Sequence, residues 1–146
     1  MAIPEGQASS MKLLIDTNVI IDMAIQREPF AKASTQVIFL AQNKQFHSYV
    51  SAAAISDLYY VSRKMTGRAA AVSFLKKLVT ICDIAPVGRT SIESALASNF
   101  KDVEDAIQNQ VAVANGIGTV VTRNIKDFTQ SELQIVTPDQ LLKMLT

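Results

Sequence analysis

The chain has 146 residues, of which 49% are hydrophobic, and its formal net charge at pH 7 is +1. This length supports one domain with a sizeable core and is too short for two comfortable ones. No apolar run approaches the ~20 residues of a membrane-spanning helix, so we expect a soluble protein and no membrane partner. The near-neutral charge gives no general electrostatic case for nucleic-acid binding, so any such site has to be local.

Residues 1–10 combine Pro, Gly, Ser, Gln and Ala, without a basic start or an apolar segment of signal-peptide length. We interpret them as a flexible leader or a remnant of expression, and residues 11–146 as the folded domain. The single cysteine, Cys82, has no partner for an internal disulfide and lies in an apolar run, which favours burial. This cysteine usage suits a reducing cytoplasm, so we expect a cytoplasmic protein.

Strand-like and helix-like patterns alternate along the whole chain. In the first half, the predicted segments are a strand at residues 12–16, helices at 19–25 and 30–43, a strand at 47–50, and helices at 52–64 and 67–79. In the second half, they are a strand at 79–85, helices at 91–100 and 102–115, strands at 119–122 and 134–136, and a helix at 138–145. The alternation predicts an α/β fold with a parallel sheet covered by helices on both faces.

Asp16 is the first candidate for chemistry. It directly follows the apolar residues of the first strand, and ligands of an open parallel sheet collect just past the carboxyl ends of its strands. A structural alternative is that Asp16, Thr17 or Asn18 caps the next helix by accepting a hydrogen bond from a free backbone N–H. We place Thr17 and Asn18 beside Asp16 as candidate substrate-binding residues.

Further acidic positions follow along the chain. Asp57 lies early in a predicted helix, where aspartate is intrinsically unfavourable, although a solvated side chain is the structural alternative. Asp102 fits an N-cap with Asp105 at the capping-box position. Capping explains Asp105 less well, because two acidic neighbours already serve the helix dipole. Asn124 and Asp127 come after a buried strand, again at a carboxyl end.

In an α/β sheet these scattered positions can converge on one cleft. Clustered carboxylates repel each other unless a cation binds them, and oxygen ligands without histidine or thiolate select Mg²⁺ or Mn²⁺. Such an ion orients a water, lowers its pKa and neutralises charge on a phosphodiester. Arg123 and Lys126 are candidates for holding substrate phosphates.

Four ordered motifs make this interpretation more specific. They are Leu-Leu-Ile-Asp16-Thr-Asn-Val-Ile, Ser51-Ala-Ala-Ala-Ile-Ser-Asp57-Leu-Tyr-Tyr, Asp102-Val-Glu-Asp105-Ala and Val-Val-Thr122-Arg-Asn124-Ile-Lys-Asp127-Phe. Together they resemble the PIN-domain family, and within it the VapC-like toxins of prokaryotic toxin–antitoxin pairs. The resemblance implies a Rossmann-like α/β/α sandwich, Mg²⁺- or Mn²⁺-dependent endoribonuclease activity on RNA, homodimerisation and, for the toxins, inhibition by a small antitoxin protein.

The resemblance also assigns roles to residues. Asp16 and Asp105 match the first and third metal-binding acids, while the second position, most often glutamate in the family, is Asp57 and is one methylene shorter. That shortening favours a shifted metal or a water-bridged contact. The fourth position varies, which leaves Asn124 to orient a metal-bound water or Asp127 to supply charge. The candidate catalytic residues are Asp16, Asp57, Asp105 and Asp127, and the candidate metal ligands are Asp16, Asp57, Asp105 and Asn124.

Two rival functions fit the same residues. The first is a binding module that keeps the PIN fold without useful catalysis and contacts RNA or a protein. Splayed acids would favour the module, whereas the four acidic positions gathered in one cleft within metal-bridging distance would favour the enzyme. The second is a metal-dependent phosphohydrolase of small phosphate esters. Asp16-Thr17-Asn18 lacks a second aspartate two residues on, which counts against the aspartyl-phosphate kind.

A homodimer is also expected on physical grounds. A single domain of this size and charge has a shallow cleft and little positive surface with which to hold a long RNA. Pairing two copies would double a predicted basic rim and lengthen the groove. The residues of this basic rim are Arg63, Lys64, Arg68, Arg123 and Lys126.

Overall fold

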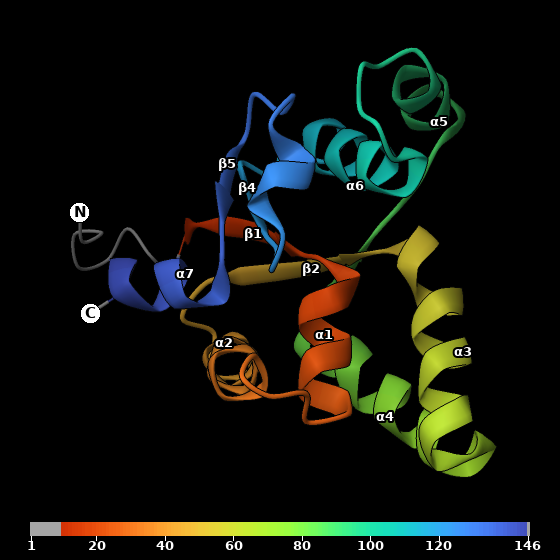
Figure 1. The fold of residues 1–146 in the computed structure, drawn as a ribbon, viewed down its shortest axis with the longest axis vertical. Helices are drawn as coiled ribbons and strands as arrows, with labels where there is room; N and C mark the ends of the chain where they lie inside the picture. Colours follow the sequence, from red (N-terminus) through yellow and green to blue (C-terminus); the bar gives the residue numbers. More distant parts are fainter. Residues whose placement is uncertain (1–9, 146) are drawn as a thin grey trace.

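The computed structural model describes residues 10–145, so the interpretation of residues 1–10 as a leader lies, apart from Ser10, outside the described residues. A five-stranded parallel sheet with the order β3-β2-β1-β4-β5 runs through the middle of the fold (Figure 1). Its strands are β1 (Lys12–Ile15), β2 (His47–Ser51), β3 (Asp83–Ala85), β4 (Thr119–Val121) and β5 (Gln134–Val136). The predicted α/β class with a parallel central sheet is confirmed.

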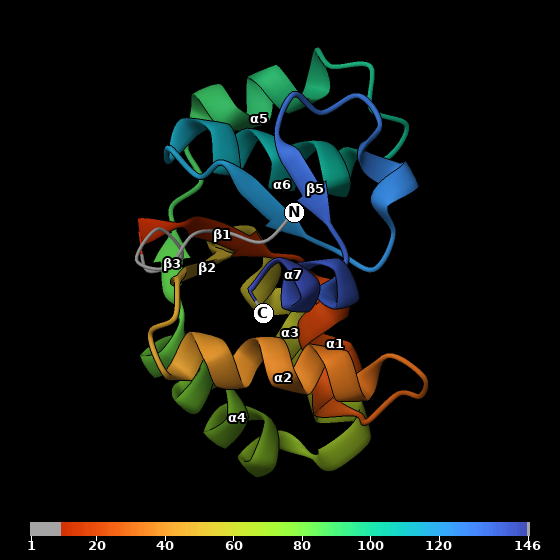
Figure 2. The ribbon, with the colours of Figure 1, turned by 90° about the vertical axis from the view of Figure 1, so that its left-hand side faces the viewer.

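Helices cover both faces of the sheet (Figure 2). One face carries α5 (Arg89–Leu96) and α6 (Val103–Ala114). The other face carries α1 (Thr17–Ala24), α2 (Ala31–Gln42), α3 (Ile55–Thr66), α4 (Arg68–Ile81) and α7 (Pro138–Met144). Short 3-10 helices lie between these elements, η2 (Ala52–Ala54) before α3 and η3 (Ile125–Phe128) after β4. The three layers form the predicted α/β/α sandwich.

The central strand β1 contributes side chains to a separate hydrophobic core on each face of the sheet. Leu13 and Ile15 belong to the larger core, together with residues of α1, α2 and α7, whereas Leu14 belongs to the smaller core with residues of α6. All three side chains are fully buried, as expected for the middle strand of a parallel sheet. The backbone N–H of Asp16 still bonds to the carbonyl of Val121, at 2.9 Å. The first polar residue after β1 is therefore fixed at the carboxyl edge of the sheet.

The boundary between α4 and β3 differs from the prediction. We expected a strand from Val79, but α4 continues to Ile81 and β3 is only three residues long. No glycine or proline interrupts residues 68–85, so nothing in this stretch ends the helix early. Cys82 follows the helix and is buried, as predicted, and burial raises the pKa of its thiol.

Two other local predictions are also corrected. The helix α5 ends at Leu96 rather than Phe100, because the Ser98 hydroxyl donates to the carbonyl of Ala95 and closes a turn. The helix α2 begins at Ala31 rather than at the predicted residue 30, because Pro29 and Phe30 lie in the preceding turn. Between residues 10 and 145, no helix is both long enough and apolar enough to span a bilayer.

Candidate functional site

A cleft of about 450 Å³ opens at the carboxyl edge of the sheet, with walls from α1, α3 and α6. Five acids line it: the predicted Asp16 after β1, Asp57 in α3 and Asp105 in α6, together with Asp22 in α1 and Glu104 in α6. Segments far apart in the sequence thus meet where an open parallel sheet binds its ligands. The structure places these three predicted site residues in one cleft.

Asp16 is buried and its carboxylate accepts three hydrogen bonds. Its Oδ1 accepts from the backbone N–H of Thr17 at 2.8 Å and from Nε2 of Gln108 at 3.1 Å. Its Oδ2 accepts from the hydroxyl of Thr122 at 2.8 Å. Asp16 is also the N-cap of α1, so the capping role that we weighed as an alternative coexists with a place in the cleft. The three donors fix the carboxylate, occupy both lone pairs of Oδ1 and leave one lone pair of Oδ2 for a cation.

Asp105 stands in the first turn of α6, among other carboxylates. Asp102 is the N-cap of α6, as predicted, and its Oδ1 accepts from the backbone N–H of Asp105 at 3.1 Å. Burial, followed by the charges of Asp16, Asp102, Asp127 and Glu104, raises the pKa of Asp105 to about 7. A divalent cation would relieve this repulsion, and carboxylate oxygens are the ligands that Mg²⁺ and Mn²⁺ prefer. The donors of the cleft therefore fit such an ion.

Asp57 is less closely associated with the other two acids. It is exposed on α3 and faces the cleft from a separate wall. Within residues 10–145, no three Asp, Glu, His or Cys side chains form a ready-made metal site. Asp57 is also not among the charges that raise the pKa of Asp105, whereas Asp16 is. A more distant acid is compatible with Mg²⁺, which usually keeps several of its waters.

The two candidates for the fourth acidic position lie outside the main cleft. The backbone N–H of Asn124 donates to the Thr122 hydroxyl at 3.2 Å, at the start of η3. Asp127 is exposed and lines a second cleft of about 250 Å³, together with Lys126 and Asp105. Asp105 thus borders both clefts, and the charge of Asp127 reaches the site from its far side.

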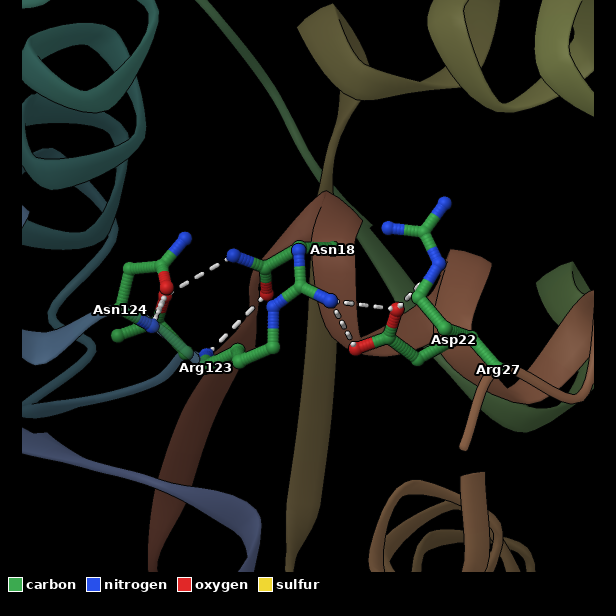
Figure 3. A network of polar contacts seen from close by, with 6 residues as sticks. Asn18, Asp22, Arg27, Arg123 and Asn124 are labelled. Carbon is green, nitrogen blue, oxygen red and sulfur yellow. Dashed lines mark hydrogen bonds and ion pairs between the residues drawn. The ribbon is translucent and has the colours of Figure 1, made fainter. Parts of the chain in front are cut away.

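The predicted substrate-binding residues have different surroundings. Thr17, Asn18 and Arg123 line the main cleft, whereas Lys126 lines the second one. The amide of Asn18 joins α1 to the segment after β4: its Oδ1 accepts from the backbone N–H of Arg123 at 3.2 Å, and its Nδ2 donates to the Thr122 hydroxyl at 3.4 Å (Figure 3). Asn18 therefore holds neighbouring residues in place with its own polar atoms.

The predicted basic rim is not continuous around the main cleft. Arg63 and Lys64 lie in the last turn of α3 and Arg68 begins α4, and none of the three lines the cleft. The cleft instead includes a basic residue that the sequence did not single out, Arg27 in the turn after α1.

Sequence reasoning also missed two buried polar residues of the cleft, Asp22 and Gln108. A signal for both exists, because each occupies a position on the buried face of a largely apolar helix. Asp22 follows the buried Val19 by three residues, and Gln108 follows Asp105 by three. Arg27 gives no such signal, since charged residues in exposed turns are common.

Comparison with known proteins identifies the family to which the chain belongs. Residues 12–126 match the family model described as PIN domain. The chain therefore belongs to the PIN-domain family. Among curated proteins it is similar to Ribonuclease VapC1 of Aquifex aeolicus (strain VF5), with 31% identity over 137 residues, which cover 90% of this chain and 94% of that protein.

Solved structures share the same architecture. VapBC-1 from nontypeable Haemophilus influenzae aligns with a TM-score of 0.68 and 17% identity, over 88% of this chain and 99% of that one. A toxin–antitoxin complex from Klebsiella pneumoniae aligns with a TM-score of 0.66 and 21% identity, over 86% and 97%. At these identities the likeness shows the fold, which confirms the predicted PIN-like sandwich.

Proposed function

We propose that this chain is a metal-dependent endoribonuclease that acts as the toxin of a toxin–antitoxin pair. The observation that carries the proposal is the meeting of Asp16, Asp57 and Asp105 in one cleft of a PIN domain. The 31% identity to Ribonuclease VapC1 supports RNA as the substrate. Bound Mg²⁺ or Mn²⁺ would supply an activated water and neutralise charge on the phosphodiester.

The chain's own residues supply the geometry for this reaction. Asp16 and Asp105 would hold the ion, with Asp57 positioned for a water-mediated contact across the cleft. The Thr122 hydroxyl, directly after β4, and the Gln108 amide, in α6, keep the Asp16 carboxylate in a single orientation. Asp127 adds negative charge behind Asp105 and so favours cation binding.

A catalytically weak RNA- or protein-binding module is the second candidate. It is favoured because, within residues 10–145, no three acids lie close enough together to hold a metal ion directly. Incubation of the purified protein with single-stranded and structured RNA tests both functions, with millimolar Mg²⁺ or Mn²⁺ and with chelator. We expect cleavage with the ion and none with chelator. RNA binding without cleavage under either condition would favour the module, whereas hydrolysis of a small phosphate ester alone would favour the phosphohydrolase.

The proposed protein partners are a second copy of the chain and a small antitoxin. The antitoxin proposal rests on the solved structures with the same fold, VapBC-1 from Haemophilus influenzae and a toxin–antitoxin complex from Klebsiella pneumoniae. A basic side chain of the antitoxin would inhibit by lying among the carboxylates in place of the ion.

Homodimerisation predicts that the active species is twice the mass of the chain. Two copies would extend the short positive surface of a single cleft into a longer one for RNA. Light scattering across a concentration series, paired with RNA cleavage by the same samples, measures this. A species that stays monomeric at tens of micromolar while cleaving at full rate would remove the dimer from the mechanism.

A further inference from the structure

The buried carboxylate of Asp22 is the centre of a second charged cluster in the cleft. Asp22 is only 1% exposed, and its two oxygens accept from Nη1 of Arg123 at 3.0 and 3.1 Å (Figure 3). The Nε of Arg27 lies 3.6 Å from Oδ1 of the same carboxylate. Burial raises the pKa of Asp22, and the two arginines act in the opposite direction. Two guanidinium groups and one ionised carboxylate leave one net positive charge.

Arg123 is held in place from several directions. Its guanidinium lies 4.6 Å from the centre of the Phe30 ring, in a cation–π contact. Its backbone N–H donates to the side-chain oxygen of Asn18. The side-chain nitrogen of Asn18 donates to the Thr122 hydroxyl, which in turn donates to the carboxylate of Asp16. A continuous set of contacts therefore fixes Arg123 relative to the first acid of the site.

Arg27 is the more available of the two arginines. Its side chain is 46% exposed, and it lines the main cleft together with Arg123. Figure 3 shows its Nε turned toward Asp22 and its two terminal nitrogens turned away from that carboxylate. Among residues 10–145, the only charged partner of Arg27 is Asp22. The terminal nitrogens present the paired donors that suit a phosphate.

We propose that Arg27 and Arg123 form a phosphate-binding subsite at the edge of the cleft, with Asp22 as the residue that positions both. The subsite would hold a phosphate of the RNA strand other than the one being cleaved. The acids need a cation to accept the scissile phosphate, whereas this cluster carries positive charge of its own. The inference rests on the proposed function, because it requires RNA to lie in this cleft.

Binding of a fluorescent single-stranded oligoribonucleotide in chelator, followed by anisotropy at several salt concentrations, tests the subsite without catalysis. For single strands, the slope of log K against log salt changes by about 0.7 for each phosphate contact. Arg27→Ala should weaken binding about tenfold at low salt and make the slope shallower by about 0.7. The control, Lys76→Ala, removes the same charge from an exposed site on α4 outside the cleft and should leave both unchanged.

Asp22→Asn distinguishes positioning of the two arginines by Asp22 from simple electrostatic attraction between the protein and RNA. The substitution keeps the size of the side chain but adds one positive charge to the protein, so long-range attraction alone would tighten RNA binding. If Asp22 positions the arginines, binding should weaken several-fold in spite of the added charge. Tighter binding would overturn the positioning role. A melting scan checks that Asp22→Asn is folded. If it is not folded, the binding of Arg27→Ala alone tests the subsite.

The outcomes distinguish the subsite from the ribonuclease proposal. If Arg27→Ala weakens RNA binding but the wild-type protein never cleaves RNA with Mg²⁺ or Mn²⁺, the phosphate-binding subsite is supported and the ribonuclease proposal is overturned. If the wild-type protein cleaves RNA but Arg27→Ala binds RNA as well as Lys76→Ala does, the ribonuclease proposal is supported and the subsite is overturned. Failure of the wild-type protein to bind RNA at any salt concentration would overturn the subsite as well.

Discussion

Asp105→Asn is expected to lower metal-dependent RNA cleavage by about a hundredfold or more while the protein stays folded. Asparagine preserves the size of the side chain but removes a charge needed to hold the ion. The position is sensitive because Asp105 lies within electrostatic reach of Asp16 and borders both clefts. Initial cleavage rates measured across a Mg²⁺ or Mn²⁺ titration should fall at every concentration and reach half-maximum at a higher one.

Asp102→Asn is the matched control for this substitution. It removes the same charge three residues earlier, but Asp102 caps α6 and does not line the main cleft. Asparagine caps a helix about as well as aspartate, so both stability and cleavage should stay within a few-fold of wild type. Equal losses in the two variants would mean that total negative charge matters, and not the place of Asp105 in the cleft.

The sequence predicted the place of Asp16 because burial constrains its position. The apolar residues of β1 fit only the middle of a parallel sheet, so Asp16 has to emerge at its carboxyl edge. Asp57 and Asp105 were harder to place, since nothing local shows which side of a helix faces the sheet edge. The family resemblance supplied that information, and the structure places both in the same cleft as Asp16.

The remaining parts of the site depend on contacts that sequence patterns do not reveal. Asn124 and Asp127 are three residues apart, but the short helix η3 turns the chain between them, and only Asp127 lines the second cleft. The predicted basic rim relied on proximity in sequence to motif residues, whereas Arg27 reaches the cleft through its contact with Asp22. The pairing of Asp22 with Arg123 becomes visible only when α1 and the segment after β4 are placed side by side.

The stability of the metal-free protein is expected to fall as pH rises from about 4 to about 7, partly because of Asp105. Its pKa is about 7 in the folded protein and lies near the ordinary value of 3.8 in the unfolded chain. Between these values the folded state binds more protons than the unfolded state, so raising the pH favours unfolding. Above the folded pKa this contribution is lost completely. Asp105→Asn cannot ionise, so it should melt several degrees higher than wild type near pH 8 and about equally near pH 4.

Mg²⁺ or Mn²⁺ should produce the opposite change in the wild-type protein. An ion that binds the ionised carboxylates stabilises the folded state, by about 2.7 kcal/mol at a hundred times its dissociation constant. For a chain of this size that corresponds to a rise in melting temperature of several degrees near pH 8. The rise should shrink toward pH 5, where protons compete for Asp105. Melting scans with the ion and with chelator measure it, with Asp16→Asn as the control. No shift in wild type at millimolar ion, or an equal shift in Asp16→Asn, would show that Asp16 and Asp105 do not hold the metal.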